Sequence, residues 1–270
     1  MLNKAATCPE IKEKSLQLHK APILEHLEVK LRSRCPDDAD VGKLILNAVE
    51  RYIRLLDFDL KWNLALSNKI LIELPSEVLL PSLKKLNLIC VVYKDEDSLV
   101  KLRSSCHVLK TLVVVREKND NVIKFSVKVP SLNSLVYINN NDDDGSRRWF
   151  SPNENFLTYL SSVKFLHMTW IDETEVFCSC VNYSQLIECM LRPCRAEYWV
   201  ESVMLLLDNS PNLKVLMIDT KGIGESDDLR RWSYVPECLS SQLEILEWKK
   251  YGGTRDEKQL LEYILASSSV

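Results

Sequence analysis

The chain has 270 residues, of which 46% are apolar and 27% charged, and its formal net charge is −3 at pH 7. This composition is ordinary for a globular protein with a sizeable core, and the lack of a broad basic surface argues against nucleic-acid binding. No apolar stretch approaches the ~18 residues that span a bilayer, and Met1 to Lys14 lacks the apolar core of a signal peptide. We therefore predict an intracellular protein, in the cytoplasm or nucleus, that binds neither membrane nor nucleic acid.

One short pattern runs through the whole chain: an apolar residue, two intervening residues, an apolar residue, one intervening residue and a third apolar residue. It occurs nine times, and subtracting successive first positions gives spacings of 23 to 31 residues. A recurrence of this length is typical of a leucine-rich-repeat solenoid. The copies are Leu24-Leu27-Val29, Ile53-Leu56-Phe58, Leu83-Leu86-Leu88, Leu109-Leu112-Val114, Leu132-Leu135-Tyr137, Val163-Leu166-Met168, Leu186-Cys189-Leu191, Leu213-Leu216-Ile218 and Leu243-Leu246-Trp248.

Each copy predicts a short strand, because residues two apart in a strand face the same way. One strand cannot bury its apolar face alone, but stacked units can, and their strands then form one parallel inner sheet. The connections should cover the other side, and Asp40–Arg51 and Glu197–Leu207 look helical. The predicted fold class is α/β, a leucine-rich-repeat solenoid with a parallel inner sheet and a C-terminal αβ cap. A non-repeat α/β fold is the alternative.

The residues between the core positions should line the inner face of the sheet. They are mostly apolar in the middle repeats and charged toward both ends. An apolar patch with a polar rim is typical of a protein-binding site, although a segment of the same chain could cover it instead. The predicted protein-binding residues are Val113, Val115, Val136, Ile138, Phe165, His167 and Met190.

The last part of the chain predicts a strand, a tight turn and a helix. Gly252 and Gly253 allow the turn, and Thr254 with Glu257 forms a capping box at the start of the helix. Such a unit can shield the last repeat from water, or it can be a partner site of its own. Four apolar residues should share one face of this helix: Leu260, Leu261, Ile264 and Leu265.

The residue order VPECL…LE.LEW..Y.G…E…L..YIL, which starts at Val235, resembles the FBD module of plant F-box/leucine-rich-repeat proteins. The stretch Leu18–Leu31 resembles the start of the repeat region in the same family. The resemblance implies a solenoid over residues 1–225 and an FBD-like module, truncated at its end, over residues 226–270. It also implies a part in a ubiquitin ligase, because in that family an F-box docks on a Skp-type adaptor while the repeats hold the substrate.

An F-box itself is not visible in the sequence. The first repeat begins by Leu24, which leaves too little chain ahead of it for this domain. Glu73–Leu80 superficially resembles an F-box opening but runs straight into the next repeat, so we interpret it as a repeat connector. We therefore expect no direct binding to a Skp-type adaptor. The leading interpretation is a protein-interaction module for an unknown partner, and the alternative is a truncated gene product without independent function.

No residues form a recognisable catalytic, cofactor or metal site. Cys178, Cys180, Cys189 and Cys194 lack the paired spacing of a zinc site, and an inward strand position favours core filling by Cys189. The acidic loop Asn139–Arg148 lacks the bidentate glutamate of a calcium loop, and no phosphate-binding motif occurs. The sequence thus predicts a protein that is not an enzyme and needs no cofactor. The alternative is an enzyme whose active site carries no recognisable motif.

Overall fold

The computed structural model describes residues 23–30, 50–59, 80–91, 106–116, 129–139, 160–170, 182–193, 199–220 and 234–268. The chain divides into two compact units. Unit 1 comprises Met1–Ile123 with Lys128–Leu132, and unit 2 comprises Lys124–Val127 with Asn133–Val270.

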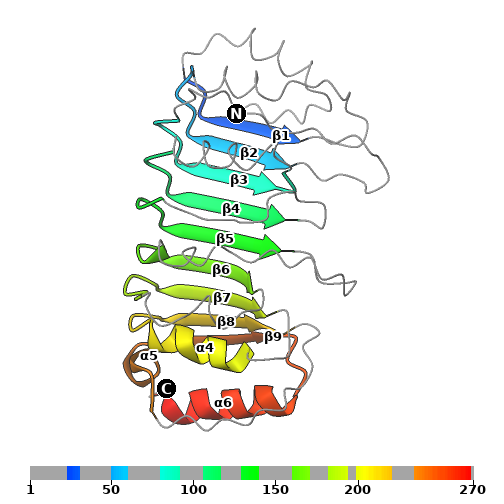
Figure 1. The fold of residues 1–270 in the computed structure, drawn as a ribbon, viewed down its shortest axis with the longest axis vertical. Helices are drawn as coiled ribbons and strands as arrows, with labels where there is room; N and C mark the ends of the chain where they lie inside the picture. Colours follow the sequence, from blue (N-terminus) through cyan, green and yellow to red (C-terminus); the bar gives the residue numbers. More distant parts are fainter. Residues whose placement is uncertain are drawn as a thin grey trace, which may run out of the picture. The chain divides into compact units, whose positions relative to one another are not determined.

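The described residues of unit 1 form four parallel strands in chain order (Figure 1). Equivalent repeat positions pair across the sheet, so that Leu27 is the partner of Leu56, and Leu86 is the partner of Leu112. This register places the apolar residues of successive repeats directly beside one another, which buries a continuous core. The strands are β1 (His26–Lys30), β2 (Leu55–Asp59), β3 (Lys85–Ile89) and β4 (Thr111–Arg116).

The described residues of unit 2 form five more strands with the same parallel pairing, and three helices that gather around the last two strands (Figure 1). The short helix α5 packs against both α4 and α6. The strands are β5 (Ser134–Asn139), β6 (Phe165–Trp170), β7 (Glu188–Pro193), β8 (Val215–Asp219) and β9 (Ile245–Lys249), and the helices are α4 (Trp199–Asp208), α5 (Glu237–Ser241) and α6 (Arg255–Ser267).

All nine predicted repeats form strands, and the fold class predicted from the sequence is confirmed. From β3 to β8 the apolar positions of the repeat are buried, and the residues between them are mostly exposed or partly exposed. Near the ends of some strands, polar residues outside the apolar positions are also buried, namely Arg116, Thr169 and Asp219. The last strand departs from this pattern, because Leu246 and Trp248 of β9 stay partly exposed. Among the described strands, β9 pairs only with β8, so no further repeat strand covers its other edge.

The predicted helix at Glu197–Leu207 is confirmed as α4, whereas Asp40–Arg51 lies outside the described residues except for a turn at its end. The Glu73–Leu80 connector and the Asn139–Arg148 loop also lie almost wholly outside them. No helix within the described residues is long and apolar enough to cross a membrane.

The C-terminal helix begins as predicted, with the Thr254–Glu257 capping box, and Gly253 turns the chain with a φ of 72°. The predicted buried face is partly wrong. Leu260 and Ile264 are buried, but Leu265 is 59% exposed, and Asp256 and Glu257 are buried instead. On this buried face the Glu257 carboxylate accepts a hydrogen bond from Thr220, the residue that follows β8.

Candidate protein-binding face

Strand register arranges the inner face of unit 2 in rows that cross the sheet. The first row is mainly apolar, and Phe165 and Ile245 in it are 45% and 53% exposed. Its members are Ser134, Phe165, Glu188, Val215 and Ile245. The second row lies two residues further along each strand and consists of Val136, His167, Met190, Met217 and Glu247.

These side chains are accessible because their neighbours in each strand fill the core. Leu135, Cys189 and Leu216 are fully buried, and Leu166 is 3% exposed. Partly exposed apolar residues in adjacent rows form one patch, the kind of surface that protein interfaces use. We call this patch the apolar inner face, and it consists of Val136, Phe165, Met190, Val215, Met217 and Ile245.

All seven residues predicted from the sequence as binding residues lie on the side of the sheet opposite the core. Five are in unit 2, where Val136, His167 and Met190 are consecutive register partners. Phe165 lies one row away on β6, and Ile138 lies near the end of β5. Val113 and Val115 lie in unit 1, beside Asn87 and Ile89 of β3. That these residues contact a partner stays a prediction.

The prediction omitted Ile245, which is more exposed than Phe165. It concentrated on the middle repeats, whereas β9 extends the apolar first row to the end of the sheet. The same strand alternation that predicted Phe165 also places Ile245 on this face. The signal was therefore present in the last repeat.

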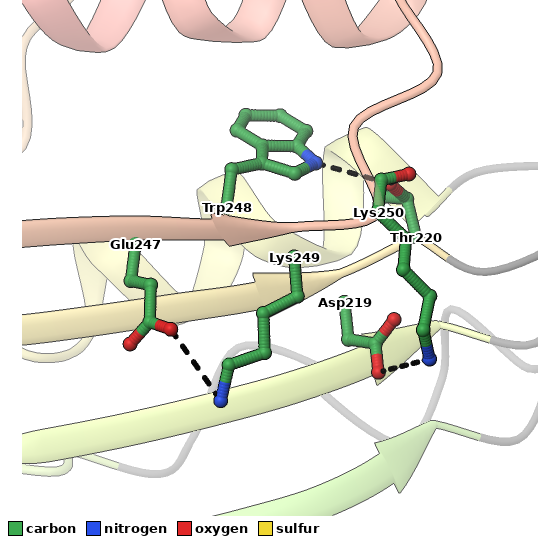
Figure 2. Close-up of polar contacts among 6 residues, drawn as sticks. All are labelled: Asp219, Thr220, Glu247, Trp248, Lys249 and Lys250. Atoms are coloured by element: carbon green, nitrogen blue, oxygen red, sulfur yellow. Dashed lines mark hydrogen bonds and ion pairs between the residues drawn. The ribbon is translucent and has the colours of Figure 1, made fainter.

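A polar cluster lies at the far ends of the same strands. Figure 2 shows Glu247 and Lys249 on one side of β9, joined by an ion pair of 3.5 Å. The Lys250 ammonium lies 3.3 Å from the Asp219 carboxylate. Partial burial lowers the pKa of His167, the cations Lys249 and Arg192 lower it further, and Asp219 offsets part of the change. These effects favour the neutral form of His167, which is a polar neighbour of the apolar inner face.

Two residues that alternation had placed on the exposed face are buried instead. Thr169 is 1% exposed and Asp219 is 7% exposed, and neither the Thr169 hydroxyl nor one Asp219 oxygen has a hydrogen-bond partner. Alternation fixes which way a side chain points, but not whether long neighbours cover it. Here Lys250 lies over Asp219, and Arg192 is the register partner of Thr169.

A buried hydrogen-bond chain holds the C-terminal module against the last repeats. The Trp248 indole points to the opposite side of β9 from Glu247 and Lys249, and its N–H donates to the Thr220 hydroxyl at 3.0 Å (Figure 2). The Thr220 hydroxyl in turn donates to the Glu257 carboxylate, which also accepts from the amides of Gly252 and Thr254 at 2.9 Å. Burial raises the pKa of Glu257, but these hydrogen bonds outweigh it and hold the pKa below its usual range.

The VPECL segment is part of the same module. Pro236 caps α5, and Cys238 and Leu239 are buried. The Cys238 thiol donates to the Leu207 carbonyl of α4 at 3.2 Å, which joins the two helices. This segment is therefore a packing element, in which Pro236, Cys238 and Leu239 are buried while Val235 and Glu237 are exposed.

The described thiols are suited to packing rather than to chemistry. Burial raises the pKa of Cys106 to about 12, and it also raises that of Cys238 to about 12 and that of Cys189. A thiol that stays protonated is neither a nucleophile nor a metal ligand. Cys189 is fully buried, as the sequence predicted, whereas Cys178, Cys180 and Cys194 lie outside the described residues. Within the described ranges, no cluster of metal-ligating side chains occurs.

Comparison with known proteins identifies both parts of the chain. Residues 231–270 match the FBD family, and residues 82–107 match the Leucine Rich Repeat family. The chain is 38% identical to an FBD-associated F-box protein of Arabidopsis thaliana, over 94% of this chain and 74% of the relative. It is 35% identical to an F-box/FBD/LRR-repeat protein of the same plant, over 95% and 74%, and 37% identical to another, over 95% and 71%. The chain therefore belongs to the F-box/FBD/leucine-rich-repeat protein family.

Proposed function

We propose that this chain is a non-catalytic protein-interaction module whose apolar inner face holds a protein partner. The observation that supports the proposal best is the exposure of Phe165 and Ile245 in one row of the sheet, although neighbouring apolar residues such as Leu166 and Leu216 are buried in the core. A solenoid does not need apolar side chains on its solvent face for stability, so their presence there favours a surface that is covered in a complex.

The relatives are named as F-box proteins, which supports a finer proposal. The repeats would act as the substrate-holding part of a ubiquitin-ligase receptor, and the FBD-like module over residues 226–270 would close the end of the solenoid over residues 1–225. The Glu257 hydrogen-bond network supports the closing role, because it joins α6 to the ends of β8 and β9. The proposed boundary near residue 225 lies outside the described residues.

Affinity capture from plant extract with matched variants tests the proposal. Phe165→Asp changes the apolar inner face, and Leu265→Asp changes an apolar residue on α6 that is somewhat more exposed. A genuine partner should be captured by the unmodified chain and by Leu265→Asp, and lost with Phe165→Asp. Loss with both variants, or with neither, would argue against the inner face as the binding site. Recovery of a polyubiquitinated partner would support the ligase role.

Two other functions predict different results. If the chain is a truncated product without independent function, no protein should be captured in a manner that depends on Phe165. If the chain is an enzyme, turnover of a substrate should be measurable, and no arrangement of described residues points to one. The interaction module is the function that the exposed apolar rows favour.

A further inference from the structure

Unit 1 has a row of basic side chains at the edge where its strands begin. The residue just before each strand is Glu25, Arg54, Lys84 or Lys110. The Lys84 amide donates to the Arg54 carbonyl at 2.8 Å, and the Lys110 amide donates to the Lys84 carbonyl at 2.8 Å. Neighbouring strands lie about 4.8 Å apart, so these residues form a continuous row. We call Arg54, Lys84, Lys110 and the adjoining Lys85 the basic edge.

The charges of the basic edge are largely unneutralised. Arg54, Lys84 and Lys110 are exposed, and Arg54 lies 3.5 Å from the Glu25 carboxylate at the start of the row. Within the described part of the chain, Lys84, Lys85 and Lys110 have no ion pair. At the corresponding edge of unit 2, by contrast, Lys214 lies 2.5 Å from the Glu244 carboxylate. Like charges at the spacing of adjacent strands repel one another even in water, so the basic edge favours a negatively charged partner.

A second charged row on the same unit limits which anion fits. Glu28 and Asp57 are register partners on the inner face, three residues further along their strands than the basic edge. At about 3.3 Å per residue this separation is about 10 Å, comparable to the Debye length at moderate salt. A nucleic acid, which carries phosphates along its whole length, would be repelled by this acidic row. A peptide can place carboxylates over the basic edge alone.

We propose that the basic edge of unit 1 docks an acidic segment of a protein partner, through exposed ion pairs to Lys84, Lys85 and Lys110. This docking is separate from the proposed function of the apolar inner face, because it uses a different surface and a different interaction. It does not require the apolar inner face to bind anything. Its contribution is electrostatic, so it governs the rate of association and the choice of partner more than the final affinity.

Fluorescence anisotropy with a labelled peptide of alternating Glu and Ser, added to the full chain at low salt, tests the proposal. The variant Lys84→Glu/Lys110→Glu should bind about tenfold more weakly, because each exposed ion pair contributes a few-fold and the reversal adds repulsion. Lys84→Gln/Lys110→Gln, which removes charge without reversing it, should give a smaller loss. The control Arg255→Glu/Lys258→Glu makes the same change in net charge at exposed positions of α6 and should change binding less than about twofold.

The matching positive test uses a peptide of alternating Lys and Ser, which should bind Lys84→Glu/Lys110→Glu better than the unmodified chain. Equal loss in the α6 control would overturn the proposal, because the effect would then be one of overall charge. Tighter binding of a single-stranded oligonucleotide with the same number of charges would overturn it in favour of nucleic acid. Unchanged binding in Lys84→Glu/Lys110→Glu would also overturn it, provided that its thermal melt matches that of the unmodified chain.

Discussion

Phe165 and Leu166 are adjacent in β6, yet the same substitution should affect them in opposite ways. Phe165 is 45% exposed on the inner face, whereas Leu166 is 3% exposed in the core. Replacing each in turn with aspartate therefore compares the two faces of one strand. The comparison tests the side-chain alternation on which the apolar inner face depends.

The expected magnitudes differ enough to be decisive. Leu166→Asp removes a buried leucine, which costs about 2–5 kcal/mol even for a change to alanine, and it buries a carboxylate at a cost of several more. The sum approaches the whole stability of a typical domain, about 5–15 kcal/mol. Phe165→Asp loses about half of the roughly 1.5–3 kcal/mol that full burial of a phenylalanine contributes. The free energy of unfolding should therefore fall by about 1–2 kcal/mol in this variant.

Thermal unfolding followed by circular dichroism measures both effects. Phe165→Asp should keep a cooperative transition, lowered by about 2–8 °C for a domain of this size, while Leu166→Asp should show no cooperative transition. Binding of a captured partner should weaken with Phe165→Asp by about 2 kcal/mol or more, as for a central interface residue. If Phe165→Asp unfolds as readily as Leu166→Asp, the alternation is wrong, and the apolar inner face does not exist as described.

Three further predictions concern the core and the C-terminal module. Because the pKa of Glu257 is held low in the fold, its ionised form stabilises the fold above the unfolded pKa of about 4.3. This contribution is lost as the pH falls through the folded pKa. The decrease in stability with falling pH should therefore be less steep in Glu257→Gln than in the unmodified chain. Gly253→Ala should lower the free energy of unfolding by about 1–2 kcal/mol, because Gly253 has a positive φ. Chemical denaturation should show a smaller decrease for Gly252→Ala. Alkylation mapped by mass spectrometry should leave Cys189 and Cys238 unmodified in the native chain, since both are buried with raised pKa; rapid native labelling of either would contradict the described packing.

The periodic apolar pattern was sufficient to predict the strands. A repeat such as Leu83-Leu86-Leu88 fixes both the position of β3 and the face that it buries, because strand geometry alternates every residue. The capping box of α6 was equally predictable, because Thr254 and Glu257 interact within one helical turn. Features that depend on residues close in sequence, or on exact repetition, need no knowledge of distant neighbours.

The candidate binding face was predicted in part for the same reason. Phe165 and Val136 could be placed on it from alternation alone, and both lie on the partly exposed side of their strands. Alternation also places Ile245 on this face, but the prediction covered only the middle repeats. In the structure the exposed row continues through β9 to Ile245. Which residues stand beside one another across strands became known only from the register.

The repeat unit, the strands, the direction in which each strand residue points and the start of the last helix all follow from local sequence patterns. What covers each surface depends on the packing of distant parts of the chain. Thr169 and Asp219 point away from the core but are buried. Glu257 of α6 is buried and accepts a hydrogen bond from Thr220, 37 residues away in the chain. Burial depends on neighbours that the fold brings from other repeats, and a local pattern carries no information about them.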